Sequence, residues 1–75
     1  MYEKLKELLV EEMSINADII SLDSEFVNDL GFNSLELADL VVLCEEKFDI
    51  VFDEAVLPRL TTVRDVVAYL EQHYA

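Results

Sequence analysis

One serine of this chain lies where a loop is expected to meet the start of a helix. Ser34 follows Gly31, the only glycine, by three residues, and a strongly helical run begins beside it. Glycine suits a chain reversal because it tolerates positive φ. Asn33 and Ser34 both suit an N-cap because their side chains accept hydrogen bonds from free N–H groups. A phosphate on the Ser34 hydroxyl would also be stabilised there by the helix dipole, so local chemistry leaves two interpretations, a cap or a phosphate-bearing hydroxyl.

A longer pattern extends from this serine through the rest of the chain. Residues 29–36 are D-L-G-F-N-S-L-E, an acidic helical run follows and ends in E-E-K-F-D at residues 45–49, and residues 60–63 are L-T-T-V. Over about residues 2–74 this pattern resembles the acyl carrier protein family, whose last helix opens with I-T-T-V. The resemblance implies that Ser34 carries 4′-phosphopantetheine through a phosphodiester and that acyl groups are held as thioesters on its terminal thiol.

The residue before this serine departs from the family pattern. Asn33 stands where the family usually has aspartate. Asparagine caps a helix about as well as aspartate, but it lacks the charge that would pair with a basic group on a modifying enzyme.

The second helical run is the expected docking face. Residues 33–54 contain seven acids and one base, Lys47. The resemblance implies a phosphopantetheinyl transferase as partner, together with basic-faced acyl-transfer, ketosynthase and related enzymes of fatty-acid or polyketide synthesis. The residues expected to contact these partners are Asn33, Leu35, Glu36, Asp39, Val42, Glu45 and Glu46. Two alternatives stay open: a carrier of aminoacyl or aryl groups, and a helical interaction module without a prosthetic group.

Composition narrows the class of protein. Seventy-five residues, 53% of them hydrophobic, predict one small domain over residues 1–75. The net charge of −12 disfavours nucleic acid and anionic membrane surfaces as partners, and no stretch approaches the roughly 20 apolar residues of a membrane span. The single cysteine cannot form an internal disulfide, which favours a reducing, cytoplasmic location. We expect a monomer.

Hydrophobic periodicity predicts an all-helical fold. The first helix should run from Tyr2 to Met13 and the second from about Ser34 to Phe48. The inward stripe of the second helix is predicted to comprise Leu37, Val41, Cys44 and Phe48, flanked by Ala38 and Leu40. Its outward side is predicted to carry Glu36, Asp39, Leu43, Glu46 and Lys47, with Leu35 and Val42 beside them. The apolar residues between these helices predict a long connection pinned to the core, with one turn of helix near residues 24–28.

Two further helices complete the expected fold. Residues 53–57 predict a short helix that ends near Pro58. Thr62 and Asp65 have the spacing of a capping box at the start of the last helix. The inward stripe of that helix is predicted to contain Val63, Val66, Val67, Leu70 and Tyr74. We therefore predict a small all-α four-helix bundle, with three longer helices, one short helix and a long first loop.

Other reactive groups are not arranged for catalysis. His73 stands alone near the C-terminus, and Cys44 falls on the inward stripe, where a buried and inert thiol is expected. The acids near Asp49 lack the alternating oxygen ligands of a calcium loop. We therefore expect a carrier rather than an enzyme, with no catalytic residues and no metal site.

Overall fold

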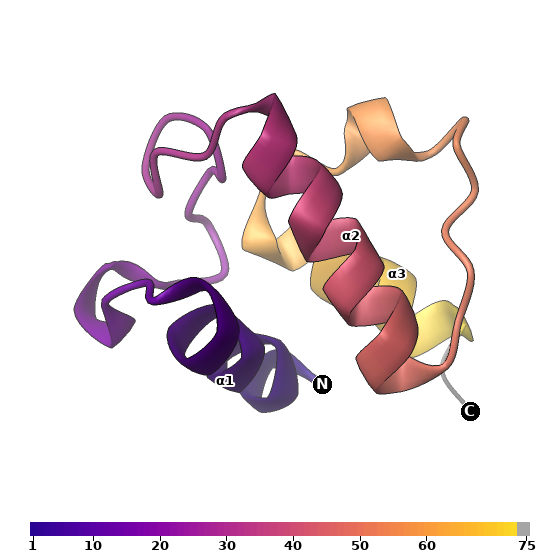
Figure 1. Ribbon diagram of the computed structural model, residues 1–75, viewed down its shortest axis with the longest axis horizontal. Helices are drawn as coiled ribbons and strands as arrows, with labels where there is room; N and C mark the ends of the chain where they lie inside the picture. Colours follow the sequence, from indigo (N-terminus) through magenta and orange to yellow (C-terminus); the bar gives the residue numbers. More distant parts are fainter. Residues whose placement is uncertain (74–75) are drawn as a thin grey trace.

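The protein is described from a computed structural model that covers residues 1–73 (Figure 1). These residues form three α-helices: α1 (Tyr2–Met13), α2 (Ser34–Phe48) and α3 (Val63–His73). Two short 3-10 turns, η1 (Ala17–Ile19) and η2 (Leu57–Arg59), lie in the connections. The predicted all-helical class and the predicted helices over Tyr2–Met13 and Ser34–Phe48 are confirmed. Within residues 1–73, no helix is long and apolar enough to cross a membrane.

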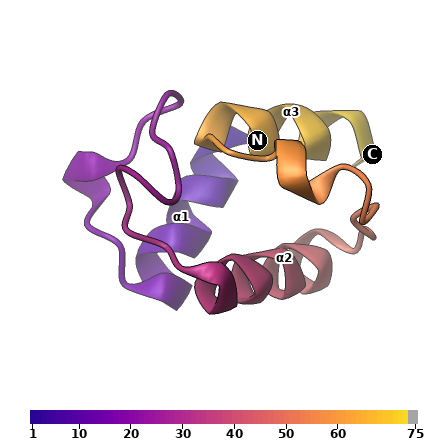
Figure 2. The same ribbon diagram turned by 90° about the horizontal axis from the view of Figure 1, so that it is seen from above.

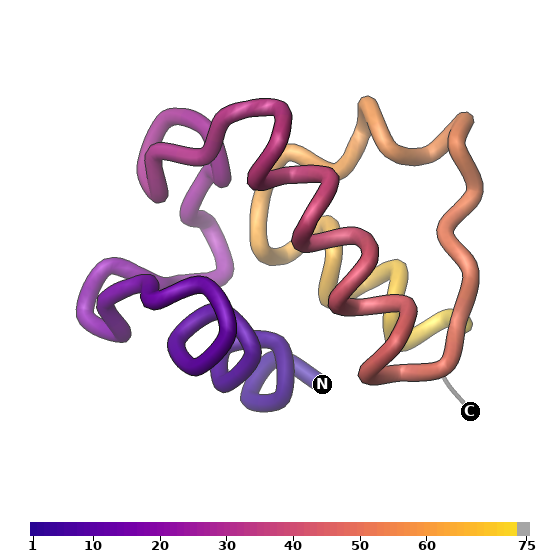
Figure 3. The backbone as a smooth tube through the Cα atoms, in the orientation of Figure 1, coloured from indigo at the N-terminus to yellow at the C-terminus, as the bar shows by residue number. Residues whose placement is uncertain are grey.

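The three helices share one hydrophobic core. α1 packs against both α2 and α3. Figure 2 shows α2 and α3 on opposite sides of the molecule with α1 toward one end, and in Figure 3 α2 passes in front of α3. The helical residues of this core are Leu5, Leu8, Leu9, Leu40, Cys44, Phe48, Val63, Val66, Val67, Tyr69 and Leu70. The predicted stripe of α3 is thus confirmed through Leu70, while Tyr74 lies outside the described residues. Leu43, predicted to face outward, instead packs half-buried against the core.

The long connection between α1 and α2 is pinned to the core, as predicted, but by fewer of its residues than expected. Ile20, Phe26 and Leu30 are buried, whereas Ile19 and Val27 are exposed. The turn of helix expected near residues 24–28 is present as one hydrogen-bonded turn that does not continue into a helix. The Glu25 carbonyl accepts from the N–H groups of Asp29 (2.9 Å) and Leu30 (3.0 Å), and the 3-10 turn of this connection is η1.

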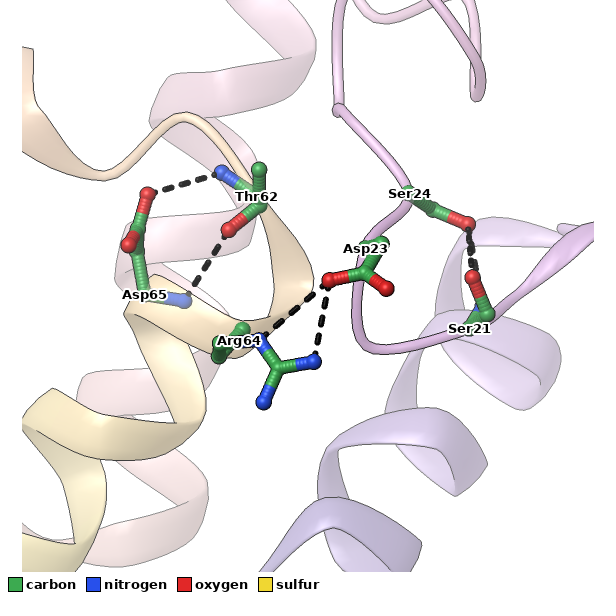
Figure 4. A network of polar contacts seen from close by, with 6 residues as sticks. All are labelled: Ser21, Asp23, Ser24, Thr62, Arg64 and Asp65. Atoms are coloured by element: carbon green, nitrogen blue, oxygen red, sulfur yellow. Dashed lines mark hydrogen bonds and ion pairs between the residues drawn. The ribbon is translucent and has the colours of Figure 1, made fainter.

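Backbone hydrogen bonds fasten this connection to the start of α3. The Phe26 N–H donates to the Thr61 carbonyl (3.0 Å) and the Val63 N–H donates to the Ser24 carbonyl (3.0 Å), which gives an isolated antiparallel bridge. The buried Ser24 hydroxyl donates to the Ile19 carbonyl at 2.9 Å and contacts the Ser21 hydroxyl (Figure 4). These hydrogen bonds therefore fix the position of the connection as far as the residues that precede Ser34.

The predicted capping box at the start of α3 is confirmed. The Asp65 N–H donates to the Thr62 hydroxyl (3.2 Å), and the Asp65 carboxylate accepts from the Thr62 N–H at 3.1 Å (Figure 4). The same carboxylate also accepts from the Thr61 N–H at 3.1 Å. The Thr61 hydroxyl donates to the same carboxylate oxygen. Partial burial raises the pKa of the Asp65 carboxyl, but the hydrogen bonds from Thr62 and Thr61 outweigh that effect and hold the pKa below its ordinary value.

Replacing Asp65 by alanine is expected to lower the free energy of unfolding by about 1 kcal/mol at pH 7. Because the pKa of this carboxyl is lower in the folded than in the unfolded state, its stabilisation is complete above the unfolded pKa of about 4 and is lost as pH falls through the folded pKa. Urea titrations of wild type and Asp65→Ala at pH 7, 5 and 3 should therefore show a difference that narrows at pH 3. A difference that stays constant across this range would contradict the assigned role.

The segment between α2 and α3 differs from the expected short helix over residues 53–57. The Asp53 carboxylate accepts from the Ala55 N–H (2.9 Å) and the Asp53 carbonyl accepts from the Val56 N–H (3.0 Å), which forms a turn. The helical residues come later, in η2, where Pro58 stands at the start of the 3-10 turn instead of ending a helix. The fold is therefore three α-helices with two 3-10 turns across residues 1–73, and the fourth helix of the predicted bundle does not form.

Candidate functional site

Ser34 is the first residue of α2 but not its cap. The N-cap is Asn33, whose side-chain oxygen accepts from the Glu36 N–H at 2.9 Å. The Glu36 carboxylate in turn accepts from the Asn33 N–H at 3.2 Å, which completes a capping box. Ser34 is exposed, and its hydroxyl has no hydrogen-bond partner among the described residues. The interpretation of Ser34 as a helix cap is therefore wrong, and its hydroxyl is available for other chemistry.

An aromatic pair fixes the residues that precede this serine. Phe26 and Phe32 are both buried, with ring centroids 5.6 Å apart, and the Phe32 N–H donates to the Phe26 carbonyl at 2.8 Å. Gly31 has φ +73°, a conformation that favours glycine because it has no side chain. Gly31 turns the chain and Phe32 anchors it, so Ser34 is presented at a fixed end of α2.

One exposed strip of α2 carries four of the residues predicted to contact partners. Leu35 is 78% exposed and Val42 is 49% exposed, and Asp39 and Glu46 are exposed beside them. At 100° per residue these four side chains fall within about 60° of one another around the helix. We call them the α2 strip. The strip combines two apolar side chains with two carboxylates, which suits a partner with a basic rim and apolar contacts.

The other three predicted contact residues also have structural roles. Asn33 and Glu36 form the capping box of α2, although Asn33 is exposed next to Ser34. Glu45 is partly buried, and its carboxylate accepts a hydrogen bond from the Phe52 N–H at 2.8 Å. These interactions tie Glu36 and Glu45 to the fold, so the α2 strip holds the acids that are most open to a partner.

An apolar cavity of about 340 Å³ opens beside α2. Its wall includes half-buried Leu37 and Val41 of the predicted inward stripe. The residues that line it are Phe26, Leu37, Ala38, Leu40, Val41, Cys44, Phe52, Leu57, Pro58, Leu60 and Val66. They come from α2, α3, the long first connection and the segment around η2. The cavity begins at Leu37, three residues after Ser34 on the same helix, so an apolar chain attached near Ser34 has a site close by.

The sequence interpretation missed Leu57 and Pro58 as parts of this wall. The predicted short helix over residues 53–57 gives Leu57 no role in packing and treats Pro58 only as its end. The sequence does contain three consecutive apolar residues at 56–58. One apolar side chain would be enough to anchor this segment, so the three together indicate a wider apolar surface.

Cys44 lines the cavity, but its thiol has low reactivity. Its side chain is fully buried, and burial together with the charge of Glu45 raises the pKa of its thiol to about 12. The thiol is therefore protonated at neutral pH, and a thiol in that state is a poor nucleophile. The predicted buried, inert cysteine is confirmed.

His73 stacks on an aromatic ring, and the described acids form no cluster that could hold a metal ion. His73 is exposed at the end of α3 and stacks on the Tyr69 ring, with centroids 4.2 Å apart. Within residues 1–73, no three His, Cys, Asp or Glu side chains are placed to hold a metal ion. The exposed Ser34 hydroxyl, the α2 strip and the apolar cavity are thus the features that carry chemistry or recognition.

Known proteins are similar to this chain over nearly its whole length. Residues 3–70 match the family described as Phosphopantetheine attachment site. The chain is 36% identical over 73 residues to the acyl carrier protein of Clostridium perfringens (strain SM101 / Type A), which covers 97% of this chain and 96% of that protein. It is 38% identical over 71 residues to the acyl carrier protein of Wolinella succinogenes, covering 95% and 93%, and 34% identical over 71 residues to that of Campylobacter lari, covering 95% and 92%. The chain therefore belongs to the acyl carrier protein family, whose members are phosphopantetheine-carrying acyl carriers.

Proposed function

We propose that Ser34 is the residue to which 4′-phosphopantetheine is attached. The observation that carries this proposal is the exposed Ser34 hydroxyl at the first residue of α2, left unbonded because Asn33 provides the cap. A modifying enzyme can reach a hydroxyl in this position without unwinding the helix. Peptide mapping of the modified protein by mass spectrometry should place the added group on the fragment that contains Ser34.

The surroundings of Ser34 suit a phosphodiester. α2 has 15 residues, so its N-terminus carries the partial positive charge of a full helix dipole. The capping box uses the N–H groups of Asn33 and Glu36, while those of Ser34 and Leu35 have no partner among the described residues. Free N–H groups at a helix start stabilise phosphate oxygens. The neutral side chain of Asn33 adds no negative charge beside them.

The apolar cavity is the proposed site for the carried chain. When bound, phosphopantetheine supplies a terminal thiol that holds acyl groups as thioesters. Each methylene that leaves water for the cavity wall contributes about 0.8 kcal/mol, and a thioester drawn toward this wall is shielded from water. The lining is made of aliphatic and aromatic side chains with one thiol, which favours an aliphatic acyl group of the fatty-acid or polyketide type over a charged aminoacyl group.

We propose that the protein presents its cargo to other enzymes and performs no catalysis itself. Cys44 is buried, and that burial raises the pKa of its thiol and makes it a poor nucleophile. His73 lies on the exposed end of α3. The core shared by the three helices supports a single carrier domain. Its partners are a phosphopantetheinyl transferase and acyl-transferring enzymes with Lys and Arg around their active sites, which dock on the α2 strip beside Ser34.

Reversing the charges of the α2 strip is expected to slow modification. The double variant Asp39→Lys/Glu46→Lys should reduce the rate of phosphopantetheine transfer about tenfold or more at low ionic strength, because steering by complementary charge sets the encounter rate. Glu36 is left unchanged because it belongs to the capping box. Raising the salt concentration should slow the wild type toward the rate of the variant. The rates are measured by intact mass during the reaction.

The matched control reverses two exposed acids of α1. Glu3→Lys/Glu7→Lys makes the same change in net charge on a different helix face, so it should be modified at nearly the wild-type rate. Circular dichroism should show the same helix content for both double variants. Equal slowing by the two double variants would mean that net charge, and not the α2 strip, controls docking.

A further inference from the structure

The segment that follows α2 is held by three hydrogen bonds to two side chains, although it has no regular secondary structure. The Tyr69 hydroxyl of α3 accepts a hydrogen bond from the Asp53 N–H (3.1 Å) and donates one to the Val51 carbonyl (3.3 Å). The Glu45 carboxylate of α2 accepts from the Phe52 N–H at 2.8 Å. Residues 51–53 are therefore fastened at every position, from two different helices.

The residue at the centre of this segment lines the cavity. Phe52 is buried, and its ring packs against the Tyr69 ring with centroids 4.8 Å apart and an angle of 30° between the planes. Neighbouring Val51 is 81% exposed, so it gives the segment little hydrophobic anchorage. The position of the Phe52 ring thus depends on the two hydroxyl hydrogen bonds, the Glu45 hydrogen bond and the ring stack.

Phe52 is attached near the end of α2 that lies farther from Ser34. Glu45 comes eleven residues after Ser34 in the same helix, which places it about 16 Å farther along the axis. Figures 1 and 2 both show the chain leaving the C-terminal end of α2 and then turning back through η2 toward the start of α3. A chain that enters the cavity from the Ser34 end would therefore reach Phe52 last.

We propose that Tyr69 and Glu45 are positioning residues that hold Phe52 as the end wall of the cavity, and that this wall sets the longest acyl chain the cavity takes. The inference rests on the proposed function, because it requires the carried chain to occupy the cavity. A fixed aromatic wall stops a growing chain at a defined length. Once the two hydrogen bonds of the Tyr69 hydroxyl are removed, the Phe52 ring and residues 51–53 can move outward, and the cavity can then hold a longer acyl chain.

The test is the variant Tyr69→Phe, which keeps the ring and removes both hydroxyl hydrogen bonds. The matched control is Tyr2→Phe, since the Tyr2 hydroxyl also donates to a backbone carbonyl, that of Ile20 at 3.3 Å, but Tyr2 does not line the cavity. Each protein is loaded by a phosphopantetheinyl transferase with straight-chain acyl groups of increasing length. The quantity compared is the melting temperature of each loaded form minus that of the same protein with unacylated phosphopantetheine. Ligands that bind only the folded state raise this temperature.

In wild type and Tyr2→Phe, the rise in melting temperature should level off at the same chain length. In Tyr69→Phe it should level off at a longer chain. Phe52→Leu, which shortens the wall itself, should move the plateau in the same direction, and the double variant should add little to either change. If the Tyr69 hydroxyl served only stability, its removal would lower the melting temperature of every loaded form without changing the chain length at the plateau. A plateau that moves in both variants therefore indicates a positioning role.

An unmoved plateau in both Tyr69→Phe and Phe52→Leu would overturn the proposal that this wall sets chain length. A plateau moved by Phe52→Leu but not by Tyr69→Phe would overturn the positioning role of Tyr69. A wild type whose melting temperature does not respond to chain length would show that the cavity does not take the chain, and the proposed cargo site would then fail together with this inference.

Discussion

Replacing Phe48 by alanine is expected to lower the free energy of unfolding by about 3–5 kcal/mol. Phe48 ends α2 and is only 3% exposed, in the core shared with α1 and α3. It does not line the cavity, so its loss leaves a void inside closed packing and not a wider cargo site. A domain of this size has only a few kcal/mol of stability to lose, so a large fraction of the variant should be unfolded at room temperature.

The measurement is urea titration followed by circular dichroism. Val42→Ala is the control, because Val42 lies on the same helix and is half exposed in the α2 strip; its effect should stay within about 0.5 kcal/mol. A loss below about 1 kcal/mol for Phe48→Ala would show that this end of α2 does not hold the core together.

The three long helices could be predicted from the sequence because their signals are local. Apolar spacing marked α1 and α2, and the Thr62–Asp65 spacing marked the start of α3, where both side-chain hydrogen bonds are present. For the cap of α2 the sequence offers two residues, since Asn33 and Ser34 are both good caps. The capping box with Glu36 decides for Asn33.

The connections were harder to predict because competing local bonds and long-range contacts determine them. At residues 53–57 the Asp53 side chain bonds the Ala55 N–H, and such a turn competes with a helix for the same backbone groups. The bridge between Glu25 and Thr62 joins residues that are far apart in the sequence, so no periodicity reports it.

The place of Ser34 at the start of α2 could be predicted, but the residues that line the cavity could not. Ser34 is marked by its neighbours Gly31 and Asn33, all within one short motif. The cavity instead depends on how far α2, α3 and the η2 segment stand from one another. Periodicity assigns Leu37 and Val41 to the inward side of α2 correctly, but it does not show that the facing elements leave space beside them.

Replacing Ser34 by alanine is expected to abolish attachment of phosphopantetheine while leaving the fold intact. The phosphodiester needs a hydroxyl, and Ser34 provides the hydroxyl at the first residue of α2. Alanine is the best helix former, and the capping box of Asn33 and Glu36 does not use the Ser34 side chain. The free energy of unfolding should therefore change by less than about 0.5 kcal/mol. Ser21→Ala is a suitable control, because Ser21 is an exposed serine on the long first connection.

The intact mass of the protein after co-expression with a broad-specificity phosphopantetheinyl transferase tests the central claim most directly. Wild type and Ser21→Ala should each gain the mass of one phosphopantetheine, and Ser34→Ala should gain none while keeping the helical circular dichroism of the wild type. A Ser34→Ala protein that still gains this mass, or a wild type that stays unmodified with several such transferases, would contradict the assignment of Ser34 as the attachment site.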